Sequence, residues 1–97
     1  MLLSYTIGVS IISDVLNVGQ SATATCFSDT ETSMIEWLYS EMTLESNTSA
    51  KQLTLTFSHV NDSIHGEVYT CRVTRMDGVQ AQQIFIPHVI GTMTIEI

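Results

Sequence analysis

Basic residues are scarce in this sequence. Among its 97 residues, three are lysine or arginine and ten are acidic, which gives a net charge of −7. A protein that binds nucleic acid or anionic lipid neutralises phosphates with a patch of basic side chains. Lys51, Arg72 and Arg75 are too few for such a patch, so we expect neither nucleic acid nor anionic lipid as a partner.

Long apolar runs and helical patterns are also lacking. Polar residues interrupt the apolar start of the chain, so we expect no direct membrane insertion of this domain. Apolar residues make up 44% of the chain and charged residues 13%, a balance that predicts a folded core. Since domains commonly hold about 100–150 residues, we expect residues 1–97 to form one domain excised from a longer protein.

Cysteine occurs only twice. Cys26 and Cys71 match neither the clustered ligands of a metal site nor a Cys-x-x-Cys redox motif, so we favour a structural disulfide. If the two residues pair, they close a loop of 46 residues, which the chain-entropy model values at about 4 kcal/mol. Because disulfides persist in oxidising compartments, we expect the protein to be extracellular, either secreted or on the cell surface.

Catalytic and metal-binding patterns are missing too. The three histidines are His59, His65 and His88, which fall in unrelated turns or strand ends without a matching serine or cysteine motif. The acidic residues lack the alternating spacing of a calcium-binding loop. We therefore expect no enzymatic activity, no metal and no cofactor.

Short alternating segments make up most of the chain. Runs rich in valine, isoleucine, threonine, tyrosine and phenylalanine alternate with polar residues, which predicts an all-β fold. The predicted strands are residues 5–13, 20–27, 34–39, 52–58, 67–76, 79–86 and 92–97. Asp77-Gly78 is the strongest hairpin signal, and Pro87 should lie at a strand end, an edge or a bulge. Many short strands at nearly regular spacing indicate a sandwich or a barrel.

Four residues in this pattern carry a family resemblance. With Cys26, Trp37 and Cys71 at these spacings, and Tyr69 two residues before the second cysteine, the chain resembles the immunoglobulin superfamily over about residues 15–86. The resemblance implies an antiparallel Greek-key β-sandwich of about seven or eight strands with one inter-sheet disulfide, Cys26–Cys71. It also implies that Trp37 packs on this bond and that the Tyr69 hydroxyl forms the hydrogen bond of a tyrosine corner.

Two positions depart from the family pattern. Six residues before the second cysteine the family usually has aspartate, and this chain has His65. Four residues before that cysteine the family usually has glycine or alanine, and this chain has Glu67. The charged bridge that normally closes this end therefore lacks its aspartate. The short span between the cysteines leaves little room for the two extra strands of a variable-type domain, so the chain looks like the I-set or C2-like domains of receptors and adhesion molecules.

Two segments satisfy the Asn-x-Ser/Thr rule for glycan acceptors. They begin at Asn47 and Asn61, and both fall in predicted turns, where a glycan can be solvated. If both asparagines carry glycans, these turns are shielded from partners and the opposite sheet is left for contact.

Alternation along the strands predicts a candidate interface. Side chains of successive strand residues point to opposite faces of a sheet, so Met34, Leu38, Val68, Arg72 and Phe85 are expected on one outer face. Glu36 would lie on the same face and pair with Arg72. Apolar patches with an arginine nearby are candidate protein interfaces.

The leading functional hypothesis is an extracellular protein-recognition module of a cell-surface adhesion molecule or receptor, for instance one resembling receptor tyrosine kinases. Its partner would be a protein, in a homophilic or receptor–ligand contact, and a weak homodimer is one form that this contact would take. The alternative is a structural spacer in a multidomain protein of immunoglobulin repeats. Binding would require an exposed outer-face patch, whereas a spacer would have two polar faces.

Overall fold

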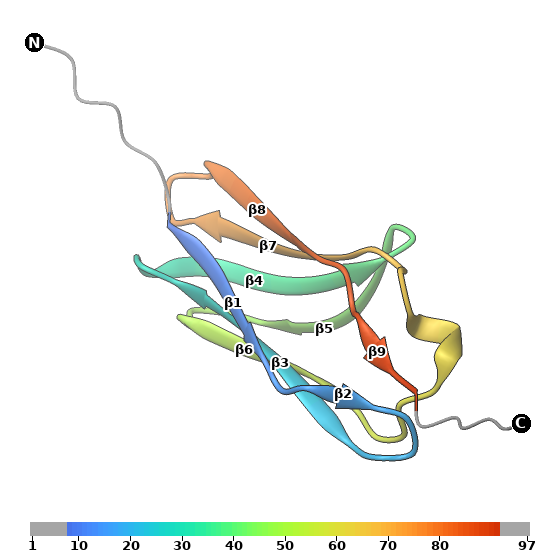
Figure 1. The fold of residues 1–97 in the computed structure, drawn as a ribbon. Coiled ribbons are helices and arrows are strands. Elements are labelled where there is room, and N and C mark those ends of the chain that lie inside the picture. Colours follow the sequence, from blue (N-terminus) through green and yellow to red (C-terminus); the bar gives the residue numbers. More distant parts are fainter. Residues whose placement is uncertain (1–7, 92–97) are drawn as a thin grey trace, which may run out of the picture.

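The computed structural model describes residues 8–91, which form short β-strands and one turn of 3-10 helix (Figure 1). The elements are β1 (Val9–Ser13), β2 (Leu16–Asn17), β3 (Ala22–Ser28), β4 (Thr32–Tyr39), β5 (Met42–Asn47), β6 (Gln52–Phe57), η1 (Asp62–Ile64), β7 (Tyr69–Arg75), β8 (Gln80–Phe85) and β9 (Val89–Ile90). The predicted strand at 92–97 and the first part of the one at 5–13 lie outside the described residues. None of the described residues belongs to a helix long and apolar enough to cross a membrane.

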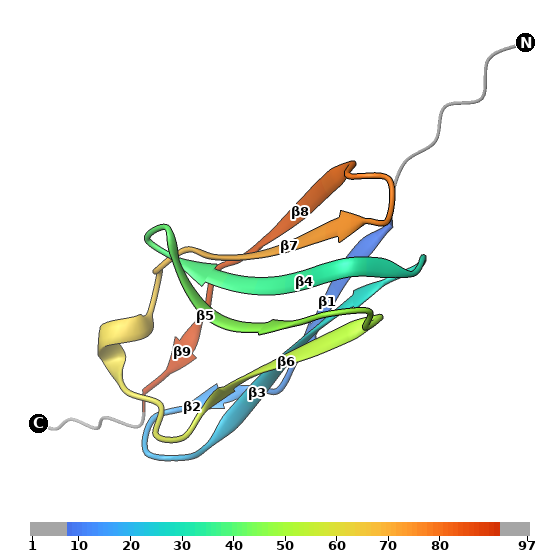
Figure 2. The ribbon, with the colours of Figure 1, turned by 180° about the vertical axis from the view of Figure 1, so that it is seen from behind.

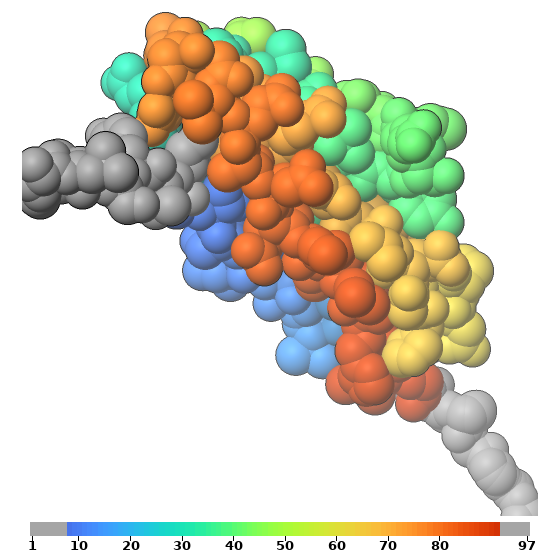
Figure 3. All heavy atoms as spheres, turned by 90° about the horizontal axis from the view of Figure 1, so that it is seen from above, coloured from blue at the N-terminus to red at the C-terminus, as the bar shows by residue number. Residues whose placement is uncertain are grey.

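Two antiparallel sheets pack face to face, as the sequence predicts. One sheet has the order β1-β3-β6 and the other has the order β5-β4-β7-β8 (Figures 1 and 2). β2 pairs in parallel with β9 and closes one side of the sandwich, where β8 and β9 run beside β1 and β2 (Figure 3). Pro87 is buried between β8 and β9, at a strand end as predicted.

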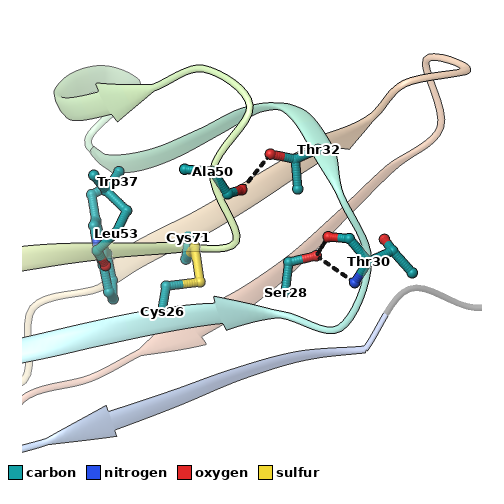
Figure 4. Close-up of a disulfide and its surroundings, with 8 residues drawn as sticks. All are labelled: Cys26, Ser28, Thr30, Thr32, Trp37, Ala50, Leu53 and Cys71. Carbon is teal, nitrogen blue, oxygen red and sulfur yellow. Dashed lines mark hydrogen bonds between the residues drawn. A yellow bond between two sulfur atoms is a disulfide. The ribbon is translucent and has the colours of Figure 1, made fainter.

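A disulfide and a tryptophan occupy the centre of the core (Figure 4). Cys26 on β3 and Cys71 on β7 form the bond, with their Cα atoms 6.4 Å apart, and both residues are fully buried. Trp37 on β4 is also fully buried, and its indole Nε1 donates a hydrogen bond of 2.9 Å to the Leu53 carbonyl on β6. Covalent and polar contacts therefore both cross from one sheet to the other.

Strand β5 is the main element that the sequence analysis missed. All six of its residues are exposed, so it lacks the alternation of buried and exposed positions by which a strand is recognised. The turn before it joins β4 to β5 through Ser40 and Glu41, which adopt positive φ angles of 51° and 67°. Two-residue hairpin turns of this kind usually contain glycine or asparagine, so this turn has no sequence signature.

The β7–β8 hairpin has a longer loop than Asp77-Gly78 alone indicates. The Arg75 amide donates to the Val79 carbonyl at 2.8 Å, so the loop comprises three residues, with Gly78 at a φ of +92°. The predicted strands 67–76 and 79–86 would leave a loop of two residues. Successive side chains on a strand point to opposite faces of the sheet. One extra loop residue therefore turns every β8 side chain that was expected on the outer face inward, and every inward one outward.

The side chain of Asp77 stabilises this hairpin loop. Its carboxylate accepts two hydrogen bonds from the Arg75 guanidinium, at 2.6 and 3.0 Å, and one from the Val79 amide at 3.1 Å. These donors favour the charged carboxylate, the Arg75 hydrogen bond most of all, and lower the pKa of Asp77 from its ordinary value of 3.8 to about 2.

We predict that Asp77→Asn destabilises the protein above pH 4 and much less near pH 2. The pKa of Asp77 is lower in the folded state than in the unfolded state. The stability that its charged carboxylate contributes is therefore complete above the unfolded-state pKa and is lost as the pH falls through about 2. Urea unfolding of both proteins at several pH values measures the difference. Glu31→Gln, an exposed acid without this loop contact, is the control, and a difference for Asp77→Asn that stayed constant with pH would contradict the prediction.

Candidate functional site

The outer face of the β5-β4-β7-β8 sheet is the candidate site. Register places Leu38, Thr70 and Ile84 in one row across β4, β7 and β8, and Glu36, Arg72 and Gln82 in the next row. Cross-strand neighbours of this kind point to the same side of a sheet. Leu38 is half-buried, and Ile84 is 55% exposed. We call this surface the outer face.

An ion pair lies in the middle of the outer face. The Arg72 guanidinium donates to Glu36 Oε1 through Nη2 at 2.8 Å and through Nε at 2.9 Å, which is the pairing that alternation predicts. The Arg72 side chain is 35% exposed and the Glu36 side chain is 13% exposed, so water screens the pair only in part. Cross-strand pairs of this kind contribute about 0.2–1 kcal/mol.

Phe85 is not part of the outer face, and our prediction for this residue is wrong. It lies opposite Tyr69 on β7 and points inward, where its ring is 6.2 Å from Trp37 and 6.5 Å from Phe57. The cause is the three-residue hairpin loop, because a two-residue loop would have placed Phe85 opposite Thr70 on the outer face. Ile84 takes the outward position instead, and the sequence analysis missed it.

A hollow lies at the end of the outer face where β4 ends and β7 begins. It measures about 400 Å³ and is lined by Tyr39, Ser40, Gly66, Glu67, Val68 and Thr70. The Tyr39 hydroxyl donates a hydrogen bond of 2.5 Å to Glu67 Oε1, which raises the pKa of Tyr39 because the carboxylate stabilises the protonated hydroxyl. Val68, at 48% exposure, extends the apolar surface of Leu38 and Ile84 to the edge of this hollow.

Comparison with protein families agrees with this architecture. A family model of the immunoglobulin domain matches residues 13–81, which include both cysteines, Trp37 and Tyr69. The chain belongs to the immunoglobulin domain family. No curated protein matches it in sequence. Immunoglobulin domains typically act as protein-interaction modules and not as enzymes.

The tyrosine corner of the immunoglobulin fold is incomplete in this domain. Tyr69 is buried and packs on Tyr39 and Phe57, with ring centroids 4.9 and 5.5 Å away, and burial raises the pKa of its hydroxyl. Within the described chain its hydroxyl makes no hydrogen bond, so the predicted corner contact is not formed. The ring is held by aromatic packing instead.

Other contacts replace the bridge that this immunoglobulin domain lacks. His65, at the position of the usual aspartate, accepts a hydrogen bond of 2.9 Å from the Val89 amide at Nδ1, and its ring lies 5.0 Å from that of His88. Glu67 accepts the bond from Tyr39. Among residues 8–91, no three side chains of histidine, cysteine, aspartate or glutamate gather as metal ligands would.

Both glycan acceptor sequences are exposed, and neither covers the outer face. Asn47 is the last residue of β5, not a turn residue, and it lies opposite the inward-facing Ile35, so its side chain points away from the outer face. Asn61 caps η1 at the end of the sandwich, where its Oδ1 accepts hydrogen bonds from the amide and the hydroxyl of Ser63.

The face assignment on β8 predicts unequal losses of stability when two adjacent residues are truncated. Phe85→Ala removes an inward aromatic ring and should lower the free energy of unfolding by about 2 kcal/mol, less than for a fully buried phenylalanine. Ile84→Ala removes an exposed side chain and should cost less than about 1 kcal/mol. Urea unfolding measures both, and equal costs would mean that the register of β8 is incorrect.

Proposed function

We propose that this immunoglobulin domain is an extracellular protein-recognition module, part of a cell-surface adhesion molecule or receptor, and that it binds its partner through the outer face. The observation that carries the proposal is the apolar surface of Leu38, Val68 and Ile84 beside the Glu36–Arg72 ion pair. Apolar residues grouped with an arginine on a regular sheet form the kind of surface that proteins use as interfaces.

The opposite sheet offers a different surface. Its outward residues include four threonines, Thr23, Thr25, Thr54 and Thr56, and the hydroxyls of Thr25 and Thr54 lie 2.9 Å apart. Ile12 on β1 is exposed there, with Thr25 directly opposite it, and the partly exposed Phe27 lies in the adjacent row of the same face. Among the described residues of this face Ile12 is the exposed large apolar side chain, whereas Val68 and Ile84 are both exposed on the outer face, so this face gives less reason to expect a partner.

The disulfide supports an extracellular location. Cys26 and Cys71 are oxidised and buried at the centre of the core, and such bonds persist outside the reducing cytosol. We infer an I-set or C2-like domain, because β5 is the one strand between β4 and β6 and it pairs with β4. Domains of that kind occur in receptors and adhesion molecules, whereas a spacer would not need the apolar outer face.

Glycosylation at Asn47 and Asn61 fits this proposal, because both side chains leave the outer face open. We predict that the chain gains N-linked glycans when it is secreted from eukaryotic cells. Intact mass before and after treatment with an N-glycosidase measures the glycans, and Asn47→Gln and Asn61→Gln assign them to each site. A secreted protein without added mass would contradict this prediction.

The proposed recognition role predicts that Ile84→Glu abolishes partner binding without unfolding the domain. The substitution places a charge on the apolar surface that the partner would cover, where it would be desolvated, so affinity should fall by at least about tenfold. The matched control is Ile12→Glu, which alters an exposed isoleucine on the opposite sheet and should leave binding intact.

Binding is measured against an arrayed set of individually expressed extracellular domains, with this domain itself included in the array. Thermal unfolding confirms that both variants fold. Binders that tolerate Ile84→Glu would contradict the assignment of the outer face. A domain that binds no protein and remains monomeric at high concentration would instead support the spacer alternative.

A further inference from the structure

We infer that the outer face binds a basic partner protein, and that the hollow beside Glu67 receives an arginine or lysine side chain of that partner. This inference rests on the proposed function and specifies the chemistry of the partner. It is carried by a positioned carboxylate, by the residues that line the hollow and by the net negative charge of the domain.

The carboxylate of Glu67 is oriented but not neutralised. Its Oε1 accepts the hydrogen bond from Tyr39, which fixes the side chain and leaves acceptor capacity on the carboxylate. In the described part of the chain, ion pairs join Arg72 to Glu36 and Arg75 to Asp77, and none involves Glu67. Glu67 is half-buried, so a cation brought to it would interact in a medium less polar than bulk water.

The walls of the hollow suit a long cationic side chain. Its lining includes the aromatic residue Tyr39, the apolar residue Val68 and the polar residue Thr70. The aliphatic part of an arginine or lysine packs on apolar surface while its charge reaches a carboxylate, and a guanidinium also interacts with aromatic rings. Arginine is among the residues that contribute most energy to protein interfaces.

One further acidic residue lies next to the hollow. Glu41 lies at the exposed tip of the β4–β5 turn, next to Ser40, which lines the hollow. The whole chain carries a net charge of −7. A field of this sign accelerates encounter with a basic surface and opposes encounter with an acidic one.

A second copy of this domain fits the outer face less well than a basic partner does. Two copies would each bring a net charge of −7 to the contact. The cation on the outer face, Arg72, already pairs with Glu36, so reaching Glu67 of another copy would break that pair. We therefore infer a heterophilic contact and not the homophilic one that the sequence analysis also allowed.

The first experiment probes the hollow with N-acetyl-arginine amide and with its neutral citrulline counterpart. NMR spectra of the isotope-labelled chain should show saturable shifts of the amides of residues 66–70 with the arginine compound and not with the citrulline compound. Glu67→Gln should weaken this binding by at least about tenfold, because it removes the charge but keeps an oxygen that accepts from Tyr39. Glu31→Gln, which removes one exposed charge elsewhere, should leave binding unchanged.

The second experiment tests the partner itself. We select each protein in the array that binds the unmodified domain but not the Ile84→Glu variant. Its affinity for the Glu67→Gln and Glu31→Gln variants is then measured at low and high salt. We expect these binding proteins to be basic and to bind more weakly at high salt. Their affinity should fall by at least about tenfold with Glu67→Gln.

The outcomes separate the inference from the proposed function. Binders that require Ile84 but tolerate Glu67→Gln would overturn the cationic contact and leave the outer face as the interface. Binders that tolerate both variants would overturn both. Self-association that Ile84→Glu abolishes, measured by sedimentation, would overturn the basic partner in favour of a second copy. An arginine amide titration without saturable shifts at the hollow would overturn the cationic contact.

Discussion

The bond between Cys26 and Cys71 fixes the arrangement on which every surface of this domain depends. It joins β3 in one sheet to β7 in the other, and both cysteines are fully buried. Trp37 adds a second connection between the sheets through its hydrogen bond to Leu53. Once these strands are held together, alternation decides which side chains enter the core and which reach the surface. The outer face is thus a consequence of the packing at the centre.

Sequence patterns predicted the parts of the fold that depend on burial. The cysteines, Trp37 and the alternating strands around them identify the sandwich, because a buried position tolerates few residue types. Strand β5 has no buried residue and enters through a turn formed by Ser40 and Glu41, so neither alternation nor turn chemistry identified it. Phe85 was assigned to the wrong face because one additional loop residue reverses alternation along the whole of β8.

The same physical distinction applies to the site. The Glu36–Arg72 ion pair was predictable because it requires only that β4 and β7 are neighbours and that both residues point outward. The Tyr39–Glu67 hydrogen bond was not predictable, since it joins the end of β4 to the loop before β7, whose geometry alternation does not set. The sequence did contain a sign of it: Glu67 occupies a position where the family usually has a small residue.

Net negative charge and exposed apolar residues act together on this surface. Val68 and Ile84 are each about half exposed, and in a neutral protein such a surface would favour association between identical copies. A charge of −7 opposes that association, because identical molecules repel one another at every approach. The same charge does not oppose a basic protein. A domain of this composition therefore keeps an apolar contact surface available and discriminates between partners by their charge.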